Sequence, residues 1–408
     1  MYDLGLTSFE FSLLSSALFL IVYGTMQIPV GLIVDNIGLK KSLFVGALVC
    51  SIAAFGLACS YSYPVAVFYR MLMGFGASFG FICLLMAVND WIPRRYSAIF
   101  IGLSQFIGTL GPMIAAGPLH VLAESSDISW RNIFFVLGYI GLAVLALITI
   151  FVKNNKQHTE RFVILRRPEK IKYSIMRLFS RQPWYIAIVS AGLFFTIEYL
   201  SENEGRTFLS LKGCNVAFAS YMVTLSWFGY ALGCPILGLL SDLIQRRKSL
   251  LTLCALFGTL SIVTIVYSTN KNLLSISFFI LGVSASGQTI GFAIMAEQFK
   301  KQFIALGFGL NNAVITIIAA INAPAIGFVL DYVKKEPQIA LSEYQSVFTI
   351  LIALALITFV ISRFFIKETY CKSAMEFTLL KRENRPTLLD ETEPTTQDFR
   401  ERCLQPAT

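Results

Sequence analysis

Two short stretches decide the fold, GLIVDNIGLKK at residues 31–41 and GLLSDLIQRRK at residues 238–248. Each begins with a glycine, places an aspartate four residues later and continues into consecutive basic residues. Glycine and aspartate positions recur at one constant offset of 207 residues. The pairs at this offset are Gly31 with Gly238, Asp35 with Asp242, and Gly102 with Gly309. A constant offset over several positions indicates an internal duplication, so we expect two similarly built halves.

The composition places both halves in a lipid bilayer. Of the 408 residues, 56% are hydrophobic and 14% are charged, and the mean hydropathy is +0.68. A soluble core could not enclose that much apolar surface. The apolar runs are long enough for helices that cross a hydrocarbon core of about 30 Å, and they lack the alternation of barrel strands. The sequence therefore predicts an all-α membrane protein.

Eleven apolar runs have the length of a membrane-spanning helix. They cover residues 11–34, 42–61, 64–88, 98–119, 132–152, 184–209, 217–240, 249–268, 273–295, 303–330 and 346–366. The loops between them differ in charge, because alternate loops carry eighteen Lys and Arg residues and the opposite loops carry at most six. An excess of Lys and Arg marks cytoplasmic loops. The basic side is therefore predicted to be cytoplasmic, and the C-terminus lies on it.

Four segments follow from these runs. They are a first bundle at 1–152, a basic cytoplasmic linker at 153–183, a second bundle at 184–367 and a polar tail at 368–408. The linker lies between two spans, so its bases are expected to contact anionic lipid headgroups rather than nucleic acid. The tail mixes acids, bases and prolines and is predicted to be a disordered cytoplasmic segment.

The offset of 207 also bears on the start of the chain. The run at 184–209, moved back by 207 positions, falls before Met1. Eleven spans with a cytoplasmic C-terminus would leave the N-terminus outside, and one more helix would return it to the cytoplasm. We therefore expect that Met1 is internal to a longer reading frame or that the chain is truncated.

Residues typical of metal sites and enzymes are sparse. The eight cysteines form no CxxC pair, five of them lie inside apolar runs, and the two histidines stand far from other metal ligands. The sequence contains no nucleotide-binding Gly-x-x-x-x-Gly-Lys-Ser/Thr loop and no pattern of a Ser/His/Asp triad. No metal, no cofactor and no enzymatic activity are expected, and the energy source is predicted to be an ion gradient rather than ATP.

The duplicated loop, together with Arg70-Met-Leu-Met-Gly74-Phe-Gly76, resembles the major facilitator superfamily (MFS) over residues 11–367. The resemblance implies two six-helix bundles related by a pseudo-twofold axis, twelve helices of which eleven are present here. The second loop departs from the family pattern at Gln245, where glycine is usual. In the fourth run, Ala115 and Ala116 replace the double glycine of the family's antiporter motif, so export by antiport is not supported.

The loop residues form a predicted conformational gate. Gly31 and Gly238 would let a neighbouring helix approach closely, and Asp35 and Asp242 would face the positive N-terminal ends of helices. By the family's pseudosymmetry these partner helices start near residues 303 and 98. The alternative is a basic loop that only orients the chain. The predicted gate residues are Gly31, Asp35, Gly38, Lys40, Lys41, Asp90, Gly238, Asp242, Arg246 and Arg247.

Ionisable and amide side chains within the spans form the predicted substrate and proton site, because charges in a bilayer cost about 2.5 to 3.5 kcal/mol each. The spacing of Glu198, Glu202 and Arg206 predicts one shared helix face, with Glu198 near mid-membrane as a proton-binding carboxylate. A local ion pair explains Glu202 and Arg206 equally well, and hydrogen bonds between helices could explain the amides. The remaining candidates are Arg70, Gln105, Gln288, Asn311 and Asn312.

Together these features predict a secondary active transporter that takes up a small polar organic solute by alternating access, coupled to a proton or other ion gradient. The alternatives are a drug or metabolite exporter and a non-transporting membrane sensor. We expect a monomeric multi-pass protein of a bacterial inner (plasma) membrane, whose partners are the solute, the coupling ion and lipid, with no nucleic acid.

Overall fold

The computed structural model describes residue 14 and residues 18–114, 129–153, 179–202, 205–300, 303–333 and 340–372. These residues form helices and connecting turns, with no strand among them. The first half contains one 3₁₀ turn at Arg94–Tyr96 and five helices. The helices are α2 (Leu18–Ile37), α3 (Leu39–Ala58), α4 (Tyr63–Trp91), α5 (Ser97–Ile114) and α7 (Trp130–Phe151).

The second half is described by eight helices. They are α10 (Arg181–Glu202), α11 (Gly205–Leu211), α12 (Val216–Ile244), α13 (Arg247–Tyr267), α14 (Lys271–Ala285), α15 (Gln288–Gln298), α16 (Ile304–Val333) and α17 (Leu341–Phe364). Ten described segments are long and apolar enough to cross a membrane, and Ser97–Gly111 is a shorter apolar helix. Each of the eleven predicted runs thus contains a helix, and the all-α membrane fold is confirmed.

One predicted span is not a single continuous helix in the described residues. The run at 273–295 is split into α14 and α15 at Ser286 and Gly287, which fall between the two helices. In the run at 184–209, α10 ends at Glu202 and α11 begins at Gly205, and residues 203 and 204 lie outside the described residues. Apolar runs predict length and composition only, whereas a break depends on where helices pack together.

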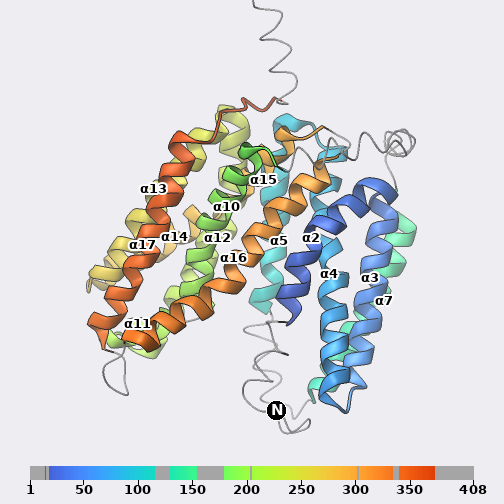
Figure 1. The fold of residues 1–408 in the computed structure, drawn as a ribbon, viewed down its shortest axis with the longest axis horizontal. Coiled ribbons are helices and arrows are strands. Elements are labelled where there is room, and N and C mark those ends of the chain that lie inside the picture. The colour runs from blue at the N-terminus through green and yellow to red at the C-terminus, as the bar shows by residue number, and fades with distance from the viewer. Residues whose placement is uncertain are drawn as a thin grey trace, which may run out of the picture.

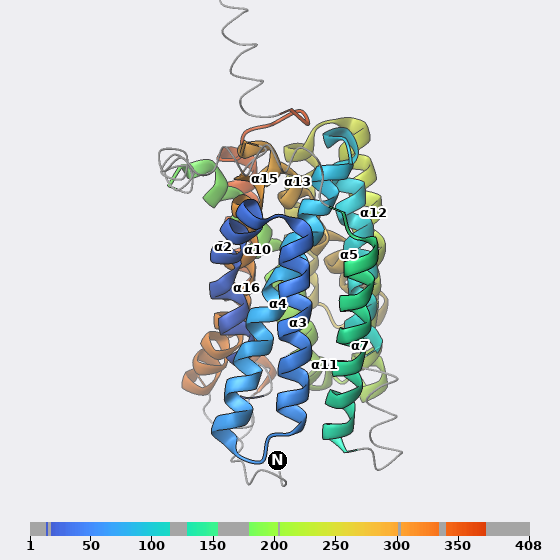
Figure 2. The ribbon, with the colours of Figure 1, turned by 90° about the vertical axis from the view of Figure 1, so that its right-hand side faces the viewer.

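The two halves lie side by side (Figure 1), with the first half in blue to teal and the second in green to red. The two halves contact each other through two pairs of helices. Helix α2 of the first half packs on α16 of the second, and α5 of the first half packs on α12 of the second. A view from the side of the first half shows α2, α3, α4, α5 and α7 running nearly parallel (Figure 2). The arrangement is that of a duplicated bundle whose halves meet at two equivalent crossings.

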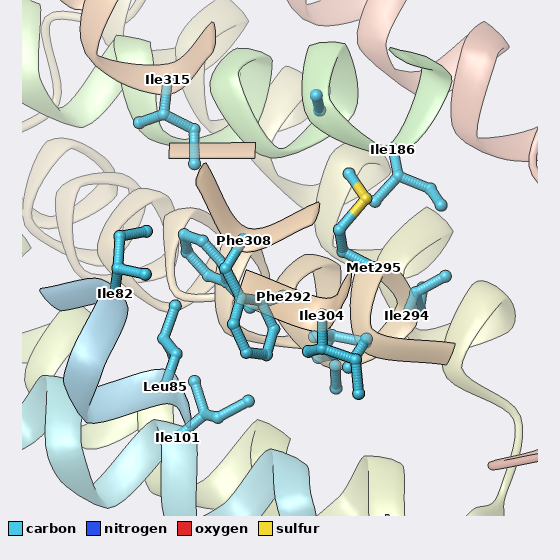
Figure 3. Packing of buried hydrophobic residues seen from close by; sticks show 14 of the residues in the cluster. Ile82, Leu85, Ile101, Ile186, Phe292, Ile294, Met295, Ile304, Phe308 and Ile315 are labelled. Atoms are coloured by element: carbon cyan, nitrogen blue, oxygen red, sulfur yellow. The ribbon is translucent and has the colours of Figure 1, made fainter. Parts of the chain in front are cut away.

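The larger buried apolar cluster joins the halves at one end of the bundle. It contains Ile82, Leu85 and Ile101 of the first half and Phe292 and Phe308 of the second half (Figure 3). This end carries the α2–α3, α4–α5, α12–α13 and α15–α16 connections, which include the predicted cytoplasmic basic loops, and is called the basic end below. A second cluster, which includes Phe208, lies entirely within the second half. Apolar packing therefore holds the halves together at the basic end.

The surface of the bundle is apolar where lipid would cover it. Only 11% of the most apolar 18-residue stretch of helix α7 is buried, although the mean hydropathy of that stretch is 2.7. Large side chains such as Ile107, Phe151 and Phe328 are more than half exposed. Exposed apolar surface of this extent would aggregate in water and is stable against hydrocarbon chains.

The described chain extends slightly into the predicted tail. The Glu368 carboxylate accepts hydrogen bonds from the backbone N–H of Lys248 at 3.1 and 3.2 Å, so it caps the start of α13. Glu368, at the start of the predicted tail, is therefore in contact with the second half. Most of the predicted linker and residues 373–408 lie outside the described residues.

Candidate functional site

A cavity of about 390 Å³ lies between the two halves. Its walls come from α2, α4 and α5 of the first half and from α10, α12, α15 and α16 of the second half. Cavities of about 300 to 1,000 Å³ are typical of small-molecule sites. The lining residues are Leu20, Tyr23, Phe81, Gln105, Gly108, Thr109, Phe194, Glu198, Trp227, Tyr230, Gln288, Phe292, Asn312, Ile315, Thr316 and Ala319.

The residues that line the cavity follow the internal duplication of the sequence. Most lining residues form pairs that are 207 positions apart, the offset that relates the two Gly-x-x-x-Asp loops. The pairs are Leu20 with Trp227, Tyr23 with Tyr230, Phe81 with Gln288, Gln105 with Asn312, Gly108 with Ile315, and Thr109 with Thr316. The cavity therefore lies on the pseudo-twofold axis, where duplicated carriers place their substrate.

Hydrogen bonds connect polar side chains of the cavity wall. The Asn312 amide donates to the Tyr23 hydroxyl at 3.1 Å and so joins α16 to α2 across the halves. The Gln288 amide donates to the Tyr230 hydroxyl within the second half. Hydroxyl and amide groups both donate and accept hydrogen bonds, so these residues keep capacity for a polar ligand.

Aromatic rings form the rest of the wall. Phe194, Trp227 and Tyr230 contact one another, with ring centroids between 5.6 and 6.3 Å apart. Phe81 of α4 meets Phe292 of α15 edge to face at 5.1 Å. Since Phe292 also belongs to the apolar cluster, this pair separates the cavity from the basic end.

Glu198 is the one charged side chain among the described lining residues. It is half-buried on α10, four residues after Phe194 and so on the same face of the helix. A carboxylate at such a place is expensive in a membrane and therefore indicates a function.

The structure brings four of the eight predicted substrate and proton residues together. Glu198, Gln105, Gln288 and Asn312 all line the cavity. Asn311 does not, because it is fully buried and points elsewhere from α16.

The other three predicted residues lie away from the cavity or outside the described side chains. Arg70 does not line it: its Nε donates to the Leu14 carbonyl at 3.0 Å, and its guanidinium lies 5.0 Å from the centre of the Phe19 ring. Arg206 is exposed on α11 and is not among the cavity residues. Residues 203 and 204 lie outside the described residues, so the helix face that it would share with Glu198 stays a prediction. Glu202 is the last residue of α10, and its side chain is outside the described part.

The two loop aspartates bind the helix N-termini expected for them. Asp35 accepts hydrogen bonds from the backbone N–H groups of Ala305 and Leu306, at 3.3 and 3.1 Å. Asp242 accepts them from Ala98 and Ile99, at 3.4 and 2.9 Å. Each carboxylate thus satisfies N–H groups that a helix start leaves unpaired and meets the positive end of the helix dipole.

The loop glycines lie at these same crossings. A Cβ atom at Gly31 or Gly238 would lie closer than 3.0 Å to the carbonyl oxygen of Ala305 or Ala98, respectively. The backbones of α2 and α16, and of α12 and α5, are therefore in direct contact at the basic end. Only glycine permits that approach without moving a helix.

A buried ion network supports the second loop. The Arg247 side chain is fully buried and lies 2.9 Å from Asp242 and 2.8 Å from Glu297. It also donates to the hydroxyl groups of Ser241 and Ser97, at 3.2 and 3.3 Å. A buried arginine needs such partners, because an uncompensated charge there would be costly.

The other predicted gate residues differ in their surroundings. Arg246 and Lys41 are exposed. Lys40 is half-buried and donates to the Thr149 carbonyl at 2.7 Å. Asp90 is half-buried near the end of α4. Gly38 is buried between α2 and α3.

Sequence reasoning missed several residues of the site. Glu297 was not among the predicted gate residues, although it lies 207 positions after Asp90 and the offset could have identified it. The same offset would also have paired two sets of polar residues of the cavity wall, Tyr23 with Tyr230 and Thr109 with Thr316. These residues could thus have been identified from the internal repeat, but not from a local sequence motif.

Comparison with known proteins agrees with this architecture. The family model described as Major Facilitator Superfamily matches residues 1–211 and 207–376. The probable sulfoacetate transporter SauU of Cupriavidus necator is 27% identical over 62% of this chain and 60% of its own length. The inner membrane metabolite transport protein YhjE of Escherichia coli is 25% identical over 72% of this chain and 71% of its own length.

Among solved structures, the proton:xylose symporter XylE bound to 6-bromo-6-deoxy-D-glucose superposes with a TM-score of 0.68 at 16% identity, covering 91% of this chain and 88% of that one. This likeness establishes the fold. With the family model matching both halves, the duplicated bundle and the cavity on its axis place this multi-pass membrane protein in the major facilitator superfamily of transporters.

Proposed function

We propose that the protein takes up a small polar organic solute and that proton binding at Glu198 drives the uptake. The observation that carries this proposal is the position of Glu198, the one charged side chain among the described residues of a cavity that both halves line. Burial disfavours the ionised form of a carboxyl group, so such a side chain can gain and lose a proton during transport.

Alternating access requires that the two ends of the cavity open in turn. At the basic end, Asp35 and Asp242 bind helices of the opposite half, and apolar packing fills the space between the halves. These contacts are the proposed gate, which holds the outward-facing state. They would separate when the solute and the proton are released to the cytoplasm.

The names of similar proteins support the solute class. One relative is a probable sulfoacetate transporter, another a metabolite transport protein, and the structural neighbour is a proton:xylose symporter. Sulfoacetate and xylose are both small and polar, as expected from a cavity that combines amide and hydroxyl groups with aromatic rings.

The test is solute accumulation by the full chain in liposomes under an imposed pH gradient. One proton per solute allows about tenfold accumulation for each pH unit. We expect Glu198→Gln to abolish accumulation while it retains exchange of solute across the membrane without a gradient. The control is Glu343→Gln, because Glu343 caps the start of α17 away from the cavity.

Accumulation that persists in Glu198→Gln, or that does not respond to the pH gradient in the unmodified protein, would contradict proton coupling. Accumulation of solute inside proton-loaded liposomes, in exchange for protons that leave, would support a proton antiporter, as expected of an exporter.

A further inference from the structure

The described lining of the cavity offers no positive charge to an organic anion. The described lining residues include no Lys, Arg or His, and they include one carboxylate, Glu198. Binding an anion in a site of low dielectric constant requires a compensating cation or several converging donors. An anionic solute would also be repelled by Glu198 whenever that side chain is ionised. Sulfoacetate, named for one relative, is such an anion.

Neutral hydrogen-bonding groups are instead repeated on both sides of the cavity. Gln105 of α5 faces the site from the first half as Asn312 of α16 does from the second. Thr109 and Thr316 follow four residues later on the same two helices. The amides both donate and accept hydrogen bonds. The Thr109 hydroxyl donates to the Gln105 backbone carbonyl at 2.8 Å and can still accept from a solute. Such a set of groups matches a solute that carries hydroxyl groups on all sides.

The aromatic wall suits the remaining surface of such a solute. The Phe194, Trp227 and Tyr230 rings form a continuous apolar wall next to Glu198. A ring-shaped polyol has apolar C–H faces and a polar rim, so it can lie against aromatic rings while its hydroxyl groups reach the amides. Sites for small molecules commonly combine an apolar wall with few placed polar groups.

A cation is the other solute that Glu198 and an aromatic wall could bind. It would neutralise the Glu198 carboxylate and so compete with the proton for that group. Uptake with a proton requires both to be bound at once, which a neutral solute allows.

We infer that the substrate is a neutral polyhydroxylated solute, a sugar or sugar alcohol, and neither an organic acid nor an amine. The choice between neutral solute and cation rests on the proposed proton coupling, whereas the exclusion of anions rests on the described lining residues of the cavity. Gln105, Asn312, Thr109 and Thr316 bind the hydroxyl groups from both halves.

The test compares solutes that differ at one group. Equilibrium binding to the purified full chain in nanodiscs at pH 7.5, without any gradient, is measured for glucose, glucuronate and glucosamine, for the galactose series, and for sorbitol. Quenching of tryptophan fluorescence reports binding, because Trp227 lines the cavity. We expect a neutral member of the panel to bind at least about tenfold more tightly than its acidic and amino counterparts.

Preferred binding of a hexuronate or of a hexosamine would overturn the inference, and so would the absence of binding by every neutral member. These outcomes are independent of proton coupling, because no gradient is present. A Glu198→Gln variant that loses accumulation under a pH gradient but keeps neutral-sugar binding separates the two proposals.

Matched variants locate the binding groups. Gln105→Leu and Asn312→Leu keep side-chain size and remove hydrogen bonds, so each is expected to weaken sugar binding about tenfold. The control is Ile107→Val, because Ile107 also lies on α5 but is 65% exposed and does not line the cavity. Unchanged affinity in folded Gln105→Leu and Asn312→Leu proteins would refute the assignment, and Thr109→Val with Thr316→Val tests it again if the leucine variants do not fold.

Discussion

At the scale of single residues, the two loops differ in backbone conformation. Gly38 has φ 87° and ψ 166°, a region that is essentially restricted to glycine. The equivalent residue in the second loop, 207 positions later, is Gln245, with φ 56° and ψ 25°. This is the left-handed helical region, which other residues enter at a modest cost. The family's glycine is therefore required in the first loop and replaceable in the second.

Replacing Gly38 tests this difference. Gly38→Ala is expected to destabilise the protein by about 1 to 3 kcal/mol, because alanine must adopt a strained backbone or shift the start of α3. The measurement is thermal unfolding in detergent. Gly80→Ala is the matched control, since Gly80 lies within α4 with open space around it and alanine favours helix. Equal melting temperatures for Gly38→Ala and the unmodified protein would show that the conformation carries no strain.

At the scale of helices, one buried arginine joins four elements. Arg247 begins α13 and binds Asp242 near the end of α12, Glu297 near the end of α15 and Ser97 at the start of α5. The first three elements belong to the second half, and α5 belongs to the first. Any opening of the basic end must therefore separate Arg247 and Asp242 from α5.

Removing one partner should weaken this junction. Glu297→Gln is expected to cost about 3 to 5 kcal/mol, because it leaves part of the buried Arg247 charge uncompensated. The measurement is again thermal unfolding, with Arg246→Gln as the control because Arg246 is exposed beside Arg247. A Glu297→Gln protein as stable as its control would indicate that Asp242 alone compensates Arg247.

At the scale of the whole molecule, the halves meet at two equivalent crossings. Gly31 and Gly309 lie where α2 crosses α16, and Gly238 and Gly102 lie where α12 crosses α5. In each crossing a glycine from one half contacts backbone of the other. The closed basic end thus depends on backbone contact at both crossings at once.

Side chains placed in these crossings should open the basic end. The double variant Gly31→Ala with Gly238→Ala is expected to shift the population towards the state in which this end is open, because each methyl group would meet a backbone carbonyl. Spin labels at Phe44→Cys in α3 and Ser249→Cys in α13, with the native cysteines replaced, report the distance between the halves. Both positions are exposed. An unchanged distance distribution, compared with Gly80→Ala, would contradict the gate.

The repeat and the hydropathy of the sequence determined the elements and their pairing. Apolar run length predicts a spanning helix wherever lipid is the solvent, so a helix could be located in each of the eleven runs. The resemblance to the family implied which helix starts receive Asp35 and Asp242, and the offset of 207 related the two pairs to each other. Both are properties of the chain that do not depend on details of packing.

Only the tertiary structure decided which side chains face the cavity. Asn311 and Asn312 are adjacent in sequence, yet one is buried and the other lines the cavity, because neighbours on a helix point about 100° apart. In a membrane, lipid is as apolar as a protein interior, so hydropathy does not distinguish an outward face from a packed one. For the same reason the break between α14 and α15, and the burial of Arg247 beside exposed Arg246, became visible only once the helices were packed.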